Sequence, residues 1–164
     1  MKTLLTLFTL AMPLFFLGSN IAHADAVSCQ ALSIKAPKSV NIKTAMKAPD
    51  KNVRSPYCLV SGVMAQRMGV DGKFYSIQFE LRLPNYWQGR FAYQFNGGND
   101  GEVKPALGAM TGLIGSQYAI NQGFAVVSSN GGHDARANPE AGLAGGALFG
   151  HDPEARRDYG YGAV

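Results

Sequence analysis

The sequence lacks the short motifs that mark several large enzyme classes. No serine has glycine at both the second position before it and the second position after it, so the G-x-S-x-G nucleophile elbow is absent. There is also no H-E-x-x-H zinc motif, no P-loop and no dinucleotide-binding fingerprint. The 164 residues therefore contain no complete catalytic motif of these kinds.

The chain also lacks a large excess of positive or negative charge. Fifteen Lys and Arg residues stand against eleven Asp and Glu residues, and the basic ones are spread along the chain without a dense block. No nucleic-acid-binding motif accompanies them. We therefore expect no nucleic-acid partner.

The N-terminus has the features of a secretory signal peptide. Lys2 precedes an apolar run from Leu4 to Leu17, and Ala22-His23-Ala24 fits the small-x-small pattern of a cleavage site. A membrane anchor is the alternative, but a span needs about 20 apolar residues and Pro13 lies inside this shorter run. We predict that residues 1–24 are removed, and that the protein is secreted or periplasmic with no membrane contact afterwards.

Only two cysteines are present, Cys29 and Cys58, and both lie in the part expected to be exported. An even number in an oxidising compartment favours pairing, so a Cys29–Cys58 disulfide is predicted. Two unpaired buried thiols are the alternative. The stretch between them is rich in Lys, Pro, Ala and Asn, so residues 25–58 are expected to form an irregular segment stapled by the disulfide.

Residues 59–66 and 73–83 predict a β-hairpin. The Asp71-Gly72 pair between them is a turn signal. In the second run Tyr75, Ile77 and Phe79 alternate with polar residues, which predicts one buried face and one wet face.

A parallel unit is predicted after the hairpin. Aromatic alternation over Phe91–Phe95 and the apolar run 124–129 each predict a strand, and residues 113–122 predict a crossover helix that ends at Gly123. Strand, helix and parallel strand form a βαβ unit. Residues 59–164 are therefore expected to be the N-terminal portion of an α/β-hydrolase sheet, with an antiparallel hairpin before the βαβ unit.

Two loops follow the carboxyl ends of the predicted parallel strands, where sites form in α/β sheets. Asn96–Gly101 contains three glycines, which let backbone N–H groups face an oxygen that carries negative charge. An ordinary tight turn is the alternative for this loop. The second loop, residues 130–134, contains His133 and is expected to converge with the first.

His133 has three interpretations. As a general base it needs an orienting acceptor and a nucleophile, and the adjacent Asp134 is expected to point elsewhere, so a structural hydrogen-bonding corner is preferred. A metal site made of His133, Asp134, His151 and Asp152 is the third. However, Asp152 has a better local use as the N-cap of a helix that begins at Pro153, so no metal site is predicted.

Tyr86 and Trp87 lie in the connection between the two predicted units. Trp87 is expected to plug the end of the sheet, and the alternative is that it lines a cleft. If the two aromatic residues hold an aromatic or sugar ligand, the protein is a non-catalytic exported ligand-binding module. We keep this module as the alternative function.

Three segments together resemble the N-terminal part of the tannase/feruloyl esterase family: Phe91–Gly101, Gly123–Asp134 and, above all, Phe149–Tyr161. Cys29, the Val70-Asp71-Gly72 turn and Trp87–Phe91 also fall where that family has comparable residues. The resemblance covers roughly residues 29 to 164. It implies secreted serine esterases with an α/β-hydrolase core and an inserted lid domain that holds a structural calcium.

The resemblance also implies where the catalytic groups lie. The family serine sits in a Gly-Cys-Ser-x-Gly-Gly elbow, which is expected downstream of this chain together with the triad Asp and His. Gly98 corresponds to the glycine whose N–H is one oxyanion-hole donor. Gly97, Asn99 and His133 are expected to lie near the substrate.

The resulting prediction is a truncated carboxylic ester hydrolase that acts on a small aromatic ester. The chain ends at Tyr159–Val164 without a helix stop, so a longer parent protein is expected. The fragment alone is expected to be inactive. No cofactor is predicted within it.

Overall fold

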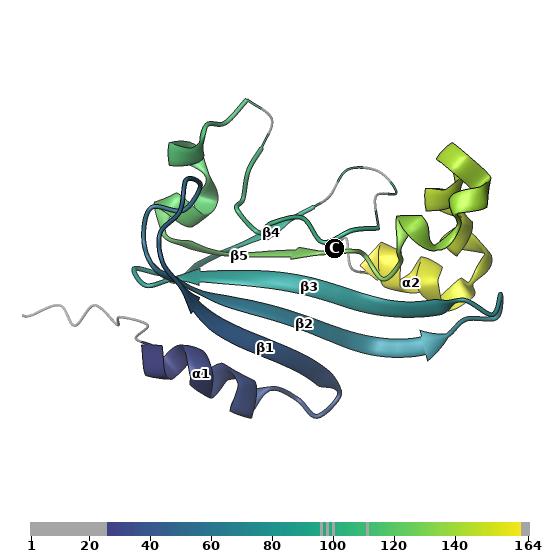
Figure 1. Ribbon diagram of the computed structural model, residues 1–164, viewed down its shortest axis with the longest axis horizontal. Helices are drawn as coiled ribbons and strands as arrows, with labels where there is room; N and C mark the ends of the chain where they lie inside the picture. The colour runs from purple at the N-terminus through teal and green to yellow at the C-terminus, as the bar shows by residue number, and fades with distance from the viewer. Residues whose placement is uncertain (1–25, 96, 98, 100, 111, 162–164) are drawn as a thin grey trace, which may run out of the picture.

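A computed structural model describes residues 26–95, 97, 99, 101–110 and 112–161. The predicted signal peptide, residues 1–24, lies outside the described residues. The chain folds around a five-stranded sheet with the strand order β1-β2-β3-β5-β4 (Figure 1). The strands are β1 (Val40–Lys47), β2 (Tyr57–Met68), β3 (Phe74–Pro84), β4 (Arg90–Gln94) and β5 (Phe124–Ser129). The helices are α1 (Ala26–Lys35), the 3₁₀ helices η1 (Gly115–Gln117), η2 (Ala119–Gln122), η3 (Ala135–Ala137) and η4 (Pro139–His151), and α2 (Pro153–Tyr161).

The predicted hairpin is confirmed by β2 and β3. The two strands pair antiparallel from Tyr57 opposite Pro84 to Met68 opposite Phe74, with a bulge between Met64 and Arg67. The turn between them is closed by the Gly69 N–H, which donates to the Lys73 carbonyl at 2.8 Å. This hairpin is the longest paired unit of the sheet.

β3 forms as predicted, but the expected division into one buried and one wet face is not observed: Ile77 and Phe79 are only half-buried, and the polar face is less exposed than predicted. Ser76 is buried, and Glu80 and Arg82 are half-buried. The reason is that the connection between β4 and β5 crosses this face, where the Glu80 carboxylate accepts a hydrogen bond from the Ala106 N–H at 2.9 Å. Polar residues of β3 therefore anchor a covering segment.

The parallel pair is confirmed by β4 and β5, whose register places Tyr93 opposite Val127. The connection between them differs from the predicted crossover helix, because residues 113–122 contain two short 3₁₀ helices instead of one α-helix. Tyr118 between them has extended backbone angles, which interrupt the helix. The predicted end is nevertheless correct, since Gly123 caps η2 with a φ of 81°.

The connection covers one face of the sheet. Ile120 and Ala106 from the connection are fully buried against Val126 of β5, together with Val53 and Tyr57 from the N-terminal side. Burying this apolar surface gives the 3₁₀ turns the tertiary support that their short length does not provide. The backbone between the parallel strands is therefore fixed by packing.

The N-terminal segment, which was expected to be irregular, contains a helix and a strand. Val40, Ile42, Thr44 and Met46 alternate with exposed residues along β1. Lysine and alanine weaken the strand signal of this segment, and pairing with the edge of β2 supplies what the local sequence lacks. Residues 48–56 remain outside regular structure.

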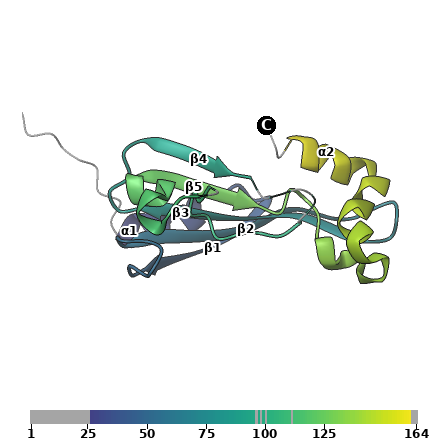
Figure 2. The ribbon, with the colours of Figure 1, turned by 90° about the horizontal axis from the view of Figure 1, so that it is seen from above.

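The predicted disulfide between Cys29 and Cys58 is confirmed, with Cα atoms 5.6 Å apart. It joins α1 to β2 on the face of the sheet opposite the β4–β5 connection, because side chains alternate between faces along each strand. The buried Cys29, Cys58 and Val60 pack there with Leu32 of α1. In Figures 1 and 2, α1 lies at one end of the sheet, and α2 lies at the other end beside the turn of the hairpin.

Within the described residues, no helix has the length and apolar character needed to cross a membrane.

Candidate active site

Two loops meet beyond the carboxyl ends of β4 and β5, as predicted. Because the strands are parallel and adjacent, residues after Gln94 and after Ser129 leave the sheet at the same edge. Gly98 lies outside the described residues. Gly97 and Asn99 are exposed, and the Asn99 carbonyl oxygen lies 3.2 Å from Nε2 of His133.

The second loop is shaped by a buried asparagine. Asn130 follows β5 and is 5% exposed. Its Oδ1 accepts hydrogen bonds from the N–H groups of Gln78 at 2.9 Å and Gly132 at 3.0 Å, and its Nδ2 donates to the Ser76 carbonyl. Gly131 and Gly132 both have positive φ, which lets the chain turn sharply after the strand. This turn directs His133 back toward the first loop.

His133 itself is a buried residue. Its side chain is 2% exposed and stacks on Phe149, with ring centroids 4.0 Å apart and ring planes 20° apart. Tyr159 of α2 packs against the imidazole edge to face, at 5.5 Å. Asp134 does not face His133, because its carboxylate accepts hydrogen bonds from the N–H and Nε of Arg136. This geometry agrees with the structural corner favoured by the sequence.

The metal alternative finds no support. Among the residues that the structure describes, no group of three His, Cys, Asp or Glu side chains is placed to hold a metal ion. Asp152 is engaged elsewhere, and His151 is exposed. As predicted, Asp152 caps α2, since its Oδ1 accepts a hydrogen bond from the Ala155 N–H at 2.7 Å.

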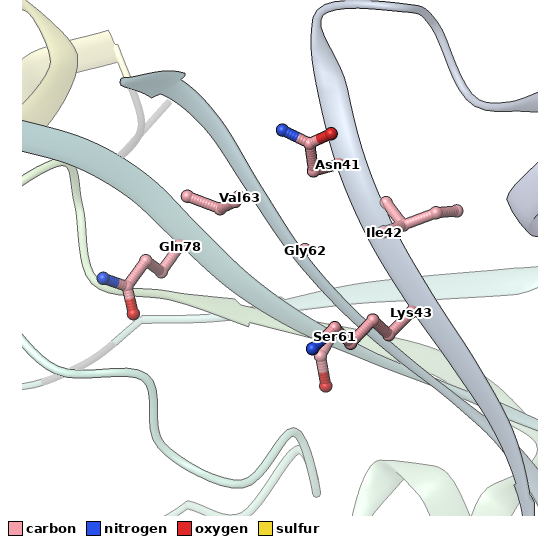
Figure 3. Close-up of a pocket in the computed structure, with 7 residues that line it drawn as sticks. All are labelled: Asn41, Ile42, Lys43, Ser61, Gly62, Val63 and Gln78. Atoms are coloured by element: carbon pink, nitrogen blue, oxygen red, sulfur yellow. The ribbon is translucent and has the colours of Figure 1, made fainter. Parts of the chain in front are cut away.

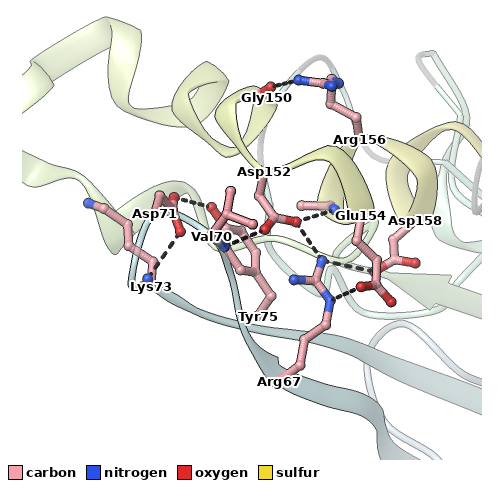
Figure 4. Close-up of polar contacts among 11 residues, drawn as sticks. Arg67, Val70, Asp71, Lys73, Tyr75, Gly150, Asp152, Glu154, Arg156 and Asp158 are labelled. Carbon is pink, nitrogen blue, oxygen red and sulfur yellow. Dashed lines mark hydrogen bonds and ion pairs between the residues drawn. The ribbon is translucent and has the colours of Figure 1, made fainter.

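A polar cluster around Asp152 was missed by the sequence reasoning (Figure 4). The Arg67 Nη2 lies 2.8 Å from Asp152 Oδ1, and the Val70 N–H donates to Asp152 Oδ2 at 2.9 Å. Glu154 and Asp158 of α2 lie 3.4 and 3.6 Å from the same guanidinium. The cluster fastens the start of α2 to the hairpin. A single arginine in the otherwise mostly apolar run 59–68 was its only sequence signal.

The cluster changes the titration of its carboxyl group. Burial alone would raise the pKa of Asp152, but hydrogen bonds from the Ala155 and Val70 N–H groups and the charge of Arg67 outweigh it and lower the pKa to about 2. Nearby, burial and the hydrogen bond from its hydroxyl to Asp71 raise the pKa of Tyr75. Asp152 is therefore ionised at every pH near neutrality.

The polar groups of the aromatic pair before β4 are both bonded within the protein. The Tyr86 hydroxyl donates to the Ile120 carbonyl at 3.0 Å, and Trp87 Nε1 donates to the Arg90 carbonyl at 2.7 Å. Trp87 is 42% exposed, so it does not plug the end of the sheet as expected.

A separate groove lies on β1, β2 and β3. It is lined by Asn41, Lys43, Ser61 and Gln78, none of which was predicted as a site residue from the sequence (Figure 3).

Comparison with known proteins places the sequence in a family. The sequence model described as "Tannase and feruloyl esterase" matches residues 58–164, which is more than half of the chain. The chain belongs to the tannase and feruloyl esterase family. The resemblance inferred from Phe91–Gly101, Gly123–Asp134 and Phe149–Tyr161 is thus confirmed.

Relatives in the family are much longer than this chain. The mono(2-hydroxyethyl) terephthalate hydrolase of Piscinibacter sakaiensis is 42% identical over 106 residues, which cover 64% of this chain and 17% of that protein. An uncharacterized esterase of Agrobacterium fabrum is 32% identical over 111 residues, or 67% of this chain and 18% of that protein. The matched stretch therefore spans less than a fifth of the length of these two curated relatives.

Solved structures agree on the fold. Feruloyl esterase B from Aspergillus oryzae superimposes with a TM-score of 0.58 at 22% identity, covering 80% of this chain and 25% of that one. A second esterase from Aspergillus oryzae gives a TM-score of 0.51 at 20% identity, with the same coverage. The mixed α/β sheet described above is thus part of a hydrolase-type esterase fold.

Proposed function

We propose that this chain forms the N-terminal part of the core of a secreted carboxylic ester hydrolase that acts on small esters of aromatic acids. In this proposal a serine outside the 164 residues attacks the ester carbonyl. The observation that carries it is the meeting of the two loops beyond β4 and β5 in a chain of the tannase and feruloyl esterase family. Sites of α/β sheets form at that edge.

The role proposed for the first loop is to stabilise negative charge. In acyl transfer the carbonyl oxygen becomes an oxyanion, and backbone N–H groups aimed at it lower the barrier. We assign the N–H of Gly98 to this task by family resemblance, with Gly97 and Asn99 beside the substrate. Glycine suits the position because a backbone without a side chain can approach a ligand closely. Family resemblance further suggests a structural calcium in the lid domain of a longer protein, while this chain would need no cofactor.

Export is proposed on two grounds. The N-terminal residues have the pattern of a signal peptide, and the buried disulfide between Cys29 and Cys58 is typical of oxidising compartments. A secreted or periplasmic location follows. Mass spectrometry of the exported protein tests this, because cleavage after Ala24 should give a mature chain that starts at Asp25.

Two measurements test the proposed reaction. The purified 164-residue chain is incubated with feruloyl, galloyl and p-nitrophenyl esters, and no turnover above background is expected because the nucleophile elbow is absent. Hydrolysis by this chain that disappears when His133 is replaced would contradict the proposal. Reading the DNA beyond codon 164 is the second test. An open frame that encodes Gly-Cys-Ser-x-Gly-Gly supports the esterase, whereas a stop codon directly after Val164 counts against it.

The oxyanion assignment has its own test in a protein extended by such a frame. Replacing Gly98 with proline removes the proposed N–H donor, and kcat is expected to fall by about a hundredfold to a thousandfold. A kcat within about twofold of the parent would refute the assignment of Gly98.

A further inference from the structure

The imidazole of His133 occupies a closed aromatic compartment. Phe149 of η4 stacks on one face of the ring, Tyr159 of α2 meets it edge to face, and the side chain is 2% exposed. Phe149 and Tyr159 also contact each other, with ring centroids 5.1 Å apart. The orientation of the His133 ring is therefore set by two side chains that lie 16 and 26 residues further along the chain.

The ring edge in turn fixes a point on the first loop. The Asn99 oxygen lies 3.2 Å from Nε2 of His133, and because a carbonyl oxygen can only accept a hydrogen bond, this contact is a hydrogen bond in the tautomer that carries the proton on Nε2. The backbone passes close to the ring at Gly101, where an added Cβ would lie 2.6 Å from His133 Cδ2. On the other side, a Cβ at Gly146 would lie 2.8 Å from the Asn99 oxygen. The Asn99 carbonyl is thus held between His133 and η4.

The aromatic compartment is anchored to the hairpin. Ala155 of α2 is fully buried and packs with Tyr75 of β3 and Phe149. One turn earlier, Asp152 receives hydrogen bonds from Arg67 and from the Val70 N–H, both in the hairpin. A continuous path of contacts therefore leads from the β2–β3 hairpin through α2 to His133.

We propose that His133 is a positioning residue: its Nε2–H holds the Asn99 carbonyl and thereby fixes the backbone at Asn99 and Gly101, which follow β4. The catalytic meaning of this role rests on the proposed function, in which the loop after β4 supplies an oxyanion-hole donor for acyl transfer. Burial and the bond to a backbone oxygen favour positioning over direct contact with a substrate. The ring would act on the reaction only through the loop.

Backbone dynamics of the 164-residue chain test the proposal without any substrate. The variant His133→Phe keeps an aromatic ring against Phe149 and Tyr159 but loses the donor. The NMR order parameters of Asn99 and Gly101 are expected to fall from about 0.85, the value of a rigid backbone, to below about 0.6. The variant His133→Gln retains an amide donor and should recover part of this loss. The control His151→Phe makes the same exchange at an exposed histidine and should change neither value.

The outcomes separate this role from the proposed function. Unchanged order parameters at Asn99 and Gly101 in folded His133→Phe would overturn the positioning role, whatever the esterase assays show. If His133→Phe fails to fold, the tautomer of His133 in the wild-type chain is measured instead by a long-range ¹H–¹⁵N spectrum. A protonated Nε2 supports the positioning role, and an unprotonated Nε2 overturns it. Absence of ester hydrolysis in a longer protein would refute the proposed function and leave the dynamics result standing.

Discussion

The two ends of the sheet are fastened by different chemistry. At the N-terminal end, α1 is tied to β2 by the Cys29–Cys58 disulfide and by apolar packing. At the other end, α2 is tied to the hairpin by the buried Asp152 carboxylate, the Arg67 guanidinium and two backbone N–H groups. The attachment of α1 through the disulfide is expected to be sensitive to reductant and insensitive to pH. The attachment of α2 through Asp152 is expected to be sensitive to pH and insensitive to reductant. His133 of the candidate active site contacts Tyr159 of α2, which belongs to the second end.

Loss of the disulfide is expected to have the largest effect on stability. The two cysteines are 29 residues apart, and closing a loop of this size stabilises a folded chain by about 3 to 4 kcal/mol in the chain-entropy model. The double variant Cys29→Ala, Cys58→Ala should lower the free energy of unfolding in urea by that amount. The resonances of His133 should stay unchanged, because α1 is remote from α2. A loss below about 1 kcal/mol would show that the covalent link hardly matters.

Removing the carboxylate at the other end is expected to cost slightly less. Asp152→Ala leaves Arg67 without its buried partner and removes the cap of α2, so the free energy of unfolding should fall by about 3 kcal/mol. Asp134→Ala is the matched control, because Asp134 also caps a short helix and pairs with an arginine but lies at the surface. Its cost should stay below about 1 kcal/mol. Equal costs for the two variants would remove the distinction between a buried and an exposed pair.

The contrast between the two ends also explains what the sequence could reveal. The hairpin was predictable because Tyr75, Ile77 and Phe79 alternate with polar residues and Asp71-Gly72 marks the turn. The disulfide followed from a count of two cysteines in a chain with a signal-like N-terminus. Both are local or combinatorial signals, which a single sequence contains.

Other features depend on contacts that no local pattern encodes. Arg67 and Asp152 are 85 residues apart, and neither has a neighbour in sequence that indicates the pairing. β1 was missed because its strand conformation depends on pairing with β2, and the helix expected at 113–122 gave way to 3₁₀ turns that bury Ile120. The convergence of His133 with the glycine loop was predicted from topology, but its aromatic surroundings were not.

The attachment of α2 through Asp152 should weaken in acid, and the attachment of α1 through the disulfide should not. The pKa of Asp152 is lower in the folded chain, about 2, than in the unfolded chain, about 3.9. Its ionised carboxylate therefore contributes its full stabilisation at a pH above about 3.9, and this contribution is lost as the pH falls through about 2. The pKa values of Asp50 and Asp71 are also lowered, so wild type must be compared with Asp152→Asn. Their difference in unfolding free energy should shrink by about 1 kcal/mol between pH 5 and pH 3, and by about 2 kcal/mol at pH 2. A difference independent of pH would show that Asp152 is not held ionised by its neighbours.

The smallest effect is expected at the rim of the same cluster. Glu154 lies 3.4 Å from Arg67 Nε, but its side chain is 57% exposed against 2% for that of Asp152. Water and salt screen such a pair, so Glu154→Gln should change the free energy of unfolding by less than about 0.5 kcal/mol, and the change should shrink further in 0.5 M NaCl. A loss comparable to that of Asp152→Ala would mean that α2 is held by the summed negative charge around Arg67. The expected result would instead assign the fastening to one buried carboxylate and its hydrogen bonds, on which the aromatic compartment of His133 then depends.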